Sequence, residues 1–175
     1  GLISQWRLEA RRWAPELRVS TVYGAPSDRS WQWRTPAHIY LTSYETLRVD
    51  FSDNPHAPAA RLWDLVALDE AQRIKNAATD VSRACKRLRR KRQWAITGTP
   101  LENSPDDLIS ILEFVEPGDS RELRQFMWSA GLRDHLGRVQ LRRRKADVLL
   151  DLPPKLVSNL VLPLTPRQRE SYDPA

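Results

Sequence analysis

Apolar and polar positions along this chain repeat with two different periods, which separates expected helices from expected strands. Apolar residues recur with the helical spacing i, i+3, i+4 and i+7 over residues 3–13, 81–88 and 105–115. Short runs rich in β-branched, aromatic and other apolar residues predict strands at residues 18–24, 38–44, 65–70 and 93–97. Strands that alternate with helices predict an α/β fold, with a mostly parallel central sheet and helices on both of its faces.

The helix predicted over residues 105–115 has the clearest boundaries. Ser104 is the expected N-cap, Pro105 is the first helical residue, and Asp107 lies three residues after the cap. Gly118 lies just past the expected end. Its core-facing residues are Leu108, Ile111, Leu112 and Val115.

Two other helices carry residues whose role the pattern leaves open. Trp6 and Trp13 share the apolar stripe of the first helix, and we interpret them as core anchors rather than base-stacking residues. The second helix has the stripe Val81, Ala84, Cys85 and Leu88. Its basic residues between positions 83 and 91 fall mostly off that stripe, which favours a solvated helix face over a nucleic-acid patch.

The remaining segments have weaker patterns. Trp31 and Trp33 fall in an expected polar loop, and residues 119–140 are weakly helical. Residues 141–175 are basic, then Pro-rich, then strand-like over residues 157–164, with a helix start at Thr165 and Pro166. We therefore divide the chain into a main domain, residues 1–140, and a basic, Pro-rich C-terminal segment, residues 141–175.

Residues 65–72, Leu-Val-Ala-Leu-Asp-Glu-Ala-Gln, carry the strongest candidate chemistry. The apolar run predicts a strand buried on both faces, and its two acids lie where open α/β sheets place their ligands. Asp69 and Glu70 are adjacent, so on an extended chain they point in different directions. One can hold a metal while the other faces a water, as nucleotide hydrolysis requires. An acidic N-cap at the start of a helix explains the same residues about equally well.

Composition narrows the class of protein. The chain has 175 residues, 41% hydrophobic and 29% charged, which is typical of a globular domain with its own core. No apolar run approaches about 18 residues, so no membrane-spanning helix is expected. The single Cys85 excludes an internal disulfide and a cysteine-rich zinc site, and suits a reducing compartment. A net charge of +6 and a pI of about 9.9 suggest an anionic partner, although a basic surface also occurs in domains that bind no anion.

A second polar segment follows the last predicted strand. Residues 97–103, Thr-Gly-Thr-Pro-Leu-Glu-Asn, place hydroxyls and backbone amides at the carboxyl edge of the sheet, where they can sense a phosphate. Alone, Gly-Thr-Pro is an ordinary turn. Beside an acidic strand end, it favours a nucleotide site.

In this order, the segments resemble the Swi/Snf-type DNA-dependent ATPases of helicase superfamily two. Asp-Glu-Ala-Gln at 69–72, continuing as Arg-Ile-Lys-Asn, resembles motif II, and residues 97–103 resemble motif III. Residues 4–17 and 39–45 resemble the motif Ia and Ib regions. The Leu-Arg-Arg-Arg-Lys run from residue 141 and the Leu-Pro-Pro-Lys at 152–155 resemble the exit from the first lobe. The resemblance covers nearly the whole chain and implies a RecA-like lobe, incomplete at its N-terminus.

The resemblance also implies roles for single residues. Asp69 would bind magnesium on ATP, normally through water, Glu70 would orient and deprotonate the attacking water, and Gln72 would couple nucleotide state to a second lobe. Coupling would continue through Thr97, Gly98 and Thr99. Contacts to double-stranded DNA are implied for Gln5, Trp6, Thr42, Ser43, Asn103, Arg142, Arg143 and Lys145. Two alternatives remain. Thr42 can simply end a strand, and residues 142–145 can form a solvated turn.

The chain departs from the family in one important respect. It contains no Gly-x-x-x-x-Gly-Lys-[Ser/Thr] phosphate loop, which in the family lies upstream of the motif Ia region, and the second lobe with its arginine fingers would lie beyond residue 175. We therefore expect a fragment of an ATP-dependent translocase of double-stranded DNA that is inactive when isolated. The alternative is a catalytically inert basic module that binds DNA or a protein.

The resemblance extends to partners and location. Duplex DNA is the expected partner, with a DNA-bound protein complex as a second one, and no membrane. A nucleoid-associated cytoplasmic protein is expected if the source is prokaryotic, which the arginine-rich composition favours, and a nuclear protein if it is eukaryotic.

Overall fold

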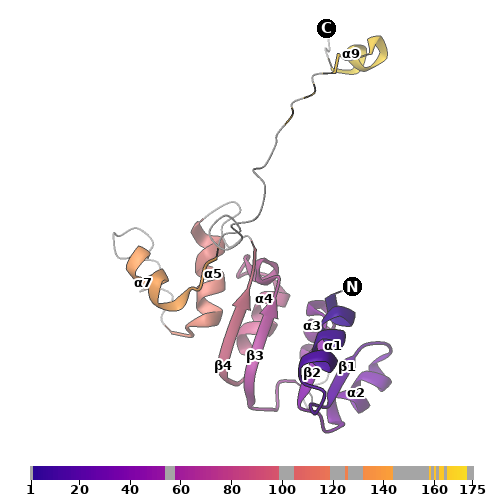
Figure 1. The fold of residues 1–175 in the computed structure, drawn as a ribbon, viewed down its shortest axis with the longest axis vertical. Helices are drawn as coiled ribbons and strands as arrows, with labels where there is room; N and C mark the ends of the chain where they lie inside the picture. The colour runs from indigo at the N-terminus through magenta and orange to yellow at the C-terminus, as the bar shows by residue number, and fades with distance from the viewer. Residues whose placement is uncertain are drawn as a thin grey trace. The chain divides into compact units, whose positions relative to one another are not determined.

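The fold was analysed in a computed structural model, which describes residues 2–53, 58–98, 105–118, 125, 132–143, 158, 160, 162–163 and 165–172 (Figure 1). The chain divides into two compact units, residues 1–136 and 137–175, and each is described by itself.

The first unit alternates helices with strands, as the pattern predicts. Its elements are α1 (Leu2–Trp13), β1 (Val19–Val22), α2 (Pro26–Arg34), β2 (Ile39–Thr42), α3 (Tyr44–Asp53), β3 (Trp63–Asp69), the 3-10 helix η1 (Ala71–Ile74), α4 (Asp80–Arg87), β4 (Arg90–Ile96) and α5 (Pro105–Val115). Helix α7 (Leu132–Val139) runs across the division, and α9 (Pro166–Tyr172) belongs to the second unit. Among the described residues, no helix is long and apolar enough to cross a membrane.

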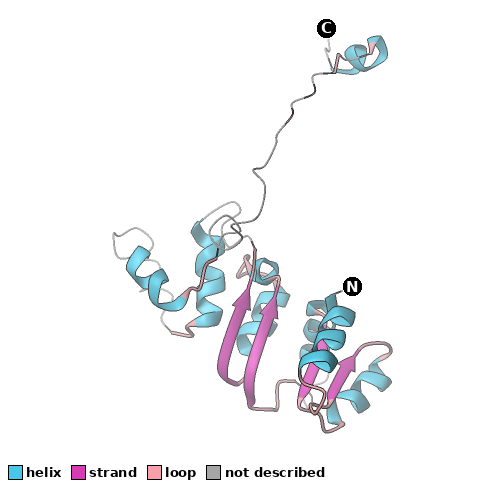
Figure 2. Cartoon of the chain, in the orientation of Figure 1, coloured by secondary structure: helices cyan, strands magenta, loops and turns pink. Residues whose placement is uncertain are grey.

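The strands pair in parallel, which confirms the predicted α/β class (Figure 2). Strand β1 pairs with β2, and β3 pairs with β4, so the described strands form two separate two-stranded sheets rather than one continuous sheet. The pairing of β3 with β4 sets the site, because its register places Asp69 beside Ile96 at the carboxyl ends of both strands.

Strand β3 differs from the prediction in its burial. Leu68 is buried in the core, but Leu65 and Ala67 on the opposite face are exposed, so the expected burial on both faces is wrong for this structure. Trp94, which pairs with Ala67, is 60% exposed. An apolar run in a strand therefore does not mean that both faces are buried. Whether each face is covered depends on which other elements pack against it.

The core lies between β3, η1, α3, α4 and α5. Its buried residues are Leu47, Leu68, Ala71, Ile74, Cys85, Leu88, Ile111 and Phe114. The predicted stripes of α4 and α5 supply three of these, Cys85, Leu88 and Ile111, which confirms both helices. Thr79 caps α4 by accepting a hydrogen bond from the Ser82 N–H, whereas the predicted cap Ser104 lies outside the described residues.

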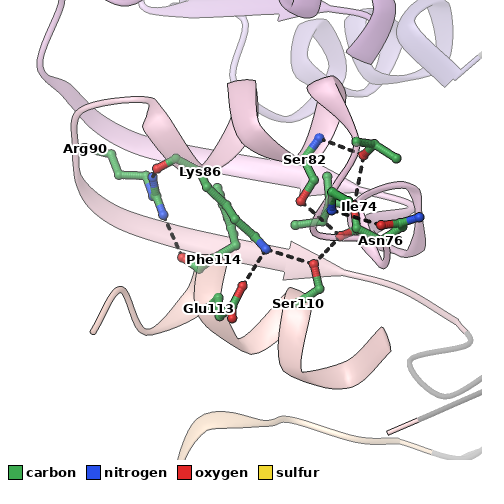
Figure 3. Close-up of polar contacts among 10 residues, drawn as sticks. Ile74, Asn76, Ser82, Lys86, Arg90, Ser110, Glu113 and Phe114 are labelled. Atoms are coloured by element: carbon green, nitrogen blue, oxygen red, sulfur yellow. Dashed lines mark hydrogen bonds and ion pairs between the residues drawn. The ribbon is translucent and has the colours of Figure 1, made fainter. Parts of the chain in front are cut away.

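A buried polar network ties α5 to η1 and α4 (Figure 3). The Lys86 ammonium donates to Glu113 Oε2 at 2.7 Å and to Ser110 Oγ at 2.8 Å. Ser110 Oγ in turn donates to the Ile74 carbonyl at 2.6 Å. The ammonium is therefore partnered on two sides, and η1, which follows Asp69 and Glu70 directly, is held against the core.

The basic run of α4 needs a correction. The helix ends at Arg87, and Arg90 and Lys91 belong to β4. Arg90 donates to the carbonyls of Lys86, Leu88 and Phe114, which satisfies the acceptors left at the helix end. Arg83 and Arg87 are exposed as predicted, but Lys86 is not part of a solvated face.

The expected loop around Trp31 and Trp33 is also wrong, because residues 26–34 form α2. Pro26 at the first helical position favours the helix start. Trp33 is buried against Tyr40 and Trp63, and its indole N–H donates to Asp50 Oδ2 at 2.6 Å. The sequence of this segment has no apolar helical stripe, and its one buried contact is the packing of Trp33 against other elements.

Helix α1 is present at its predicted position, but its tryptophans are not core anchors. Trp6 is 42% exposed and Trp13 is 75% exposed, and no residue of α1 is buried. The indole N–H of Trp13 donates to Glu9 on the same helix at 2.8 Å. The stripe therefore marks an apolar surface of α1 rather than a buried contact.

The second unit confirms the predicted helix start at Thr165 and Pro166. Gln168 Oε1 accepts from both the Thr165 N–H and the Thr165 hydroxyl at 3.0 Å, and the Gln168 N–H donates to Thr165 Oγ1 at 3.4 Å, which forms a reciprocal cap at the start of α9. Ser158, Leu160, Leu162 and Pro163 are not in a strand, so the strand expected over residues 157–164 is not found at the positions that are described.

Candidate nucleotide site

Asp69 and Glu70 separate at the end of β3, as their adjacency predicts. Asp69 is the last residue of the strand, and its Oδ1 accepts from the Glu70 N–H at 3.0 Å. Glu70 has φ 50° and ψ 52°, and it is the one non-glycine residue with positive φ among those described. This left-handed conformation turns the chain and sends the two carboxylates to different partners.

The alternative interpretation of the acids as helix caps can now be tested. Glu70 occupies the N-cap position of η1, but its side chain makes no capping hydrogen bond. Its Oε2 instead accepts from the Gln72 side-chain amide at 2.7 Å. A non-glycine residue in this conformation costs about 1–3 kcal/mol, and such strain is concentrated at functional sites. Glu70 therefore does not cap η1 with its side chain, and its chemical role stays a prediction.

Gln72 links the two predicted motifs through its amide group. It donates to Glu70, while its Oε1 accepts from the Thr97 hydroxyl at 2.8 Å. Thr97 directly follows β4, so the contact joins the carboxyl ends of the two paired strands. The sequence placed these three residues in one site, and the structure brings them into one hydrogen-bonded chain. Gly98 follows Thr97 and is exposed.

Two aromatic residues hold Asp69. The Trp6 indole N–H, from α1, donates to Asp69 Oδ2 at 2.7 Å. The Tyr44 hydroxyl, from the first residue of α3, donates to the main-chain carbonyl of Asp69 at 2.7 Å. Burial, more than any neighbouring charge, raises the pKa of Tyr44 above its ordinary value, so this hydroxyl stays protonated and remains a donor.

The sequence did not indicate the contacts of Trp6 and Tyr44 with Asp69. Trp6 was predicted at a DNA backbone, and Tyr44 was not singled out at all, although it directly follows two predicted DNA contacts. Neither partner could be found by spacing, since they lie 63 and 25 residues from Asp69.

The other predicted DNA contacts lie in three places. Gln5 is exposed on α1. Thr42 is the last residue of β2 and its hydroxyl donates to the Val22 carbonyl at 3.3 Å. Ser43 Oγ accepts from the Thr46 N–H at 3.0 Å at the start of α3. The local bonds of Thr42 and Ser43 suit a strand end and a helix start, so their contact with DNA stays a prediction.

The last predicted positions lie in the second unit or outside the described residues. Arg142 and Arg143 are exposed in the second unit. Thr99, Asn103 and Lys145 lie outside the described residues.

The donor set fits magnesium carried by a nucleotide. In the part of the chain that the structure describes, no group of three or more His, Cys, Asp or Glu side chains could hold a metal ion by itself. Asp69 is a single, partly exposed carboxylate. Magnesium keeps several waters and is usually held by one or two carboxylates together with substrate phosphates. One carboxylate at a strand end is consistent with that arrangement and does not fit a resident, protein-caged metal.

Comparison with known proteins gives a consistent result. Residues 1–174 match the model of the SNF2-related domain. The chain is 32% identical to helicase ssl-1 of Caenorhabditis elegans over 99% of its own length, which is 8% of that protein. It is 34% identical to Zorya protein ZorD of Escherichia coli over 71% of its length, which is 13% of that protein.

A solved structure agrees with these relatives. The SWI2/SNF2 ATPase core of Sulfolobus solfataricus in complex with double-stranded DNA matches 97% of the chain with 33% identity and a TM-score of 0.71. The chain spans 38% of that core. The matched organisms are an animal, a bacterium and an archaeon, so these relatives do not favour a prokaryotic source.

Proposed function

The chain belongs to the SNF2-related domain family, and we propose that it is part of the first RecA-like lobe of an ATPase that moves along double-stranded DNA. The observation that best supports this proposal is the series of hydrogen bonds Glu70–Gln72–Thr97, which joins the acidic end of β3 to the end of β4. The similar Sulfolobus core, whose structure is a complex with double-stranded DNA, supports DNA as the partner. A DNA-bound protein complex, and a nuclear or nucleoid location, belong to the same proposal.

Each site residue has a distinct task in ATP hydrolysis. Asp69 would hold the magnesium of a bound Mg·ATP, and that ion would supply charge neutralisation at the phosphates. Glu70 orients the attacking water and accepts its proton. Gln72 holds the Glu70 carboxylate through its amide N–H at 2.7 Å, and its carbonyl oxygen senses Thr97. Because the Gln72 amide makes both hydrogen bonds, its rotation would change the contact with Glu70 and the contact with Thr97 at the same time.

The first test measures phosphate release by the whole ATPase that carries this chain. Added duplex DNA is expected to raise the rate, whereas the isolated 175-residue chain, which has no phosphate loop, is expected to be inactive with or without DNA. A whole protein that shows no ATP hydrolysis but retains duplex binding would instead support the inert basic module. A rate of ATP hydrolysis that does not change when duplex DNA is added would contradict the proposed translocase.

Thr97→Val is expected to uncouple hydrolysis from movement. Valine has nearly the same shape as threonine but cannot donate to Gln72 Oε1, so the 2.8 Å bond between the strand ends is lost. The measurement is the number of base pairs travelled per ATP, from displacement of a third strand on duplex DNA. We expect this ratio to fall several-fold while the rate of ATP hydrolysis changes less.

Thr35→Val is the matched control for this experiment. The Thr35 hydroxyl donates to the Trp31 carbonyl at 3.0 Å at the end of α2, and it has no contact with Gln72 in the described residues. An equal loss of coupling in both variants, or none in Thr97→Val, would contradict the relay.

A further inference from the structure

Trp6 makes a contact that core packing does not explain. It donates from its indole N–H to Asp69 Oδ2 at 2.7 Å across 63 residues of sequence. The side chain is 42% exposed, and α1 as a whole has no buried residue. The hydrogen bond is therefore a specific contact between α1 and the carboxylate.

Tyr44 holds the same residue from a second element. Its hydroxyl donates to the Asp69 carbonyl at 2.7 Å, and Tyr44 itself packs partly buried against the core cluster. With the Glu70 N–H on Oδ1, Asp69 accepts three hydrogen bonds, two at its carboxylate and one at its peptide. Together, these contacts restrain both the side-chain rotation and the backbone of Asp69. We call the Trp6 and Tyr44 contacts the Asp69 clamp.

We propose that Trp6 and Tyr44 are positioning residues, which orient Asp69 toward the nucleotide's magnesium and make that orientation respond to duplex DNA. Partners that hold a metal-binding carboxylate set its direction and basicity, and their loss typically costs about 10–100-fold in metal affinity or activity. This inference rests on the proposed function, because it needs the nucleotide and the duplex.

The positions of the two aromatics supply the link to DNA. Trp6 follows Gln5 on α1, and Tyr44 follows Thr42 and Ser43 at the junction of β2 and α3. These neighbours are the proposed backbone contacts of the motif Ia and Ib regions. A duplex that shifts α1 or this junction by a fraction of an ångström changes a hydrogen bond to Asp69, because hydrogen bonds weaken steeply with distance and angle. The clamp thus joins two DNA-facing segments to one carboxylate.

The test uses Trp6→Phe and Tyr44→Phe in the whole ATPase. Each variant keeps an aromatic ring and removes one donor. A fluorescent ATP analogue is titrated with Mg²⁺ under conditions without turnover, both with and without duplex. We expect the Mg²⁺ concentration at half-maximal binding to rise about tenfold in Trp6→Phe. We also expect the difference between the two titrations, with and without duplex, to shrink in both variants.

The chain offers a matched control for each variant. Trp13→Phe removes an indole N–H from the same helix, but that group bonds to Glu9. Tyr40→Phe removes a hydroxyl that donates to the Thr35 carbonyl at 2.6 Å. Both controls are expected to keep the wild-type Mg²⁺ dependence, with thermal melting confirming that all four variants fold. In steady-state kinetics, the Trp6 variant should change the apparent KM for Mg·ATP together with kcat, and regain activity at high Mg²⁺.

The outcomes separate the inference from the function on which it rests. A Trp6→Phe titration that coincides with that of Trp13→Phe, with and without duplex, overturns the clamp while leaving the ATPase intact. A wild-type protein without duplex-stimulated hydrolysis overturns the proposed function itself. A general loss of nucleotide binding that high Mg²⁺ does not restore would also overturn the clamp, since a positioning role acts through the metal.

Discussion

Glu70→Gln is expected to lower duplex-stimulated ATP hydrolysis by the whole ATPase by about 10²–10⁴-fold, the usual contribution of a positioned general base. Glutamine keeps the size of the side chain but cannot accept a proton from water at neutral pH. Its amide can still meet Gln72, whose N–H lies 2.7 Å from Glu70 Oε2. The measurement is phosphate release at saturating ATP and duplex, alongside binding of a fluorescent nucleotide, which is expected to persist.

Glu45→Gln provides the control for charge. Glu45 is an exposed carboxylate on α3 that pairs with Arg73, a neighbour of Gln72, so its loss changes charge near the site without touching Glu70. It is expected to leave hydrolysis within about twofold of wild type, because exposed ion pairs contribute about 0–1 kcal/mol. Full activity in Glu70→Gln, or an equal loss in both variants, would remove Glu70 from the role of base.

Phe114→Ala is expected to reduce the free energy of unfolding by about 3–5 kcal/mol, the usual effect of emptying a buried aromatic site. Phe114 has no exposed surface and lies in the main core cluster. The Arg90 guanidinium lies 4.1 Å from its ring centroid, so the truncation also removes a cation–π contact. Chemical unfolding of the chain, followed by tryptophan fluorescence, measures the change.

Leu8→Ala is the surface counterpart of this experiment. Leu8 is 64% exposed on α1, so its truncation is expected to change stability by no more than about 0.5 kcal/mol. A loss below about 1 kcal/mol in Phe114→Ala would mean that α5 does not pack as described. Because Ala71 and Ile74 share this cluster with Phe114, the variant should also weaken the support of η1 behind Glu70.

The apolar pattern predicted secondary structure most accurately in helices whose apolar stripe is also buried. The stripes of α4 and α5 are correct because residues three and four apart share one helix face, whatever that face contacts. Arg90 and Lys91 were grouped with α4 but belong to β4, where Arg90 donates to the Lys86 and Leu88 carbonyls, a contact between elements. Helix α2 was missed for a similar reason, since one buried tryptophan packs against two other segments rather than forming a stripe.

The predicted site shows the same division. Asp69 and Glu70 could be named in advance from the end of a predicted strand, and Gln72 and Thr97 from the resemblance of their motifs to the family. The order of their contacts could not, since Gln72 reaches both Glu70 and Thr97 only after two parallel strands have paired.

The sequence alone determined the alternation of helices and strands, the place of the two carboxylates, and the family resemblance that the comparisons confirm. Only the tertiary structure decided which partners those carboxylates have and which apolar residues are covered. Trp6 was expected inside the core and lies instead on Asp69, half exposed. The physical reason is range: secondary structure follows from interactions over a few residues, whereas a hydrogen bond across 63 residues depends on how whole elements pack.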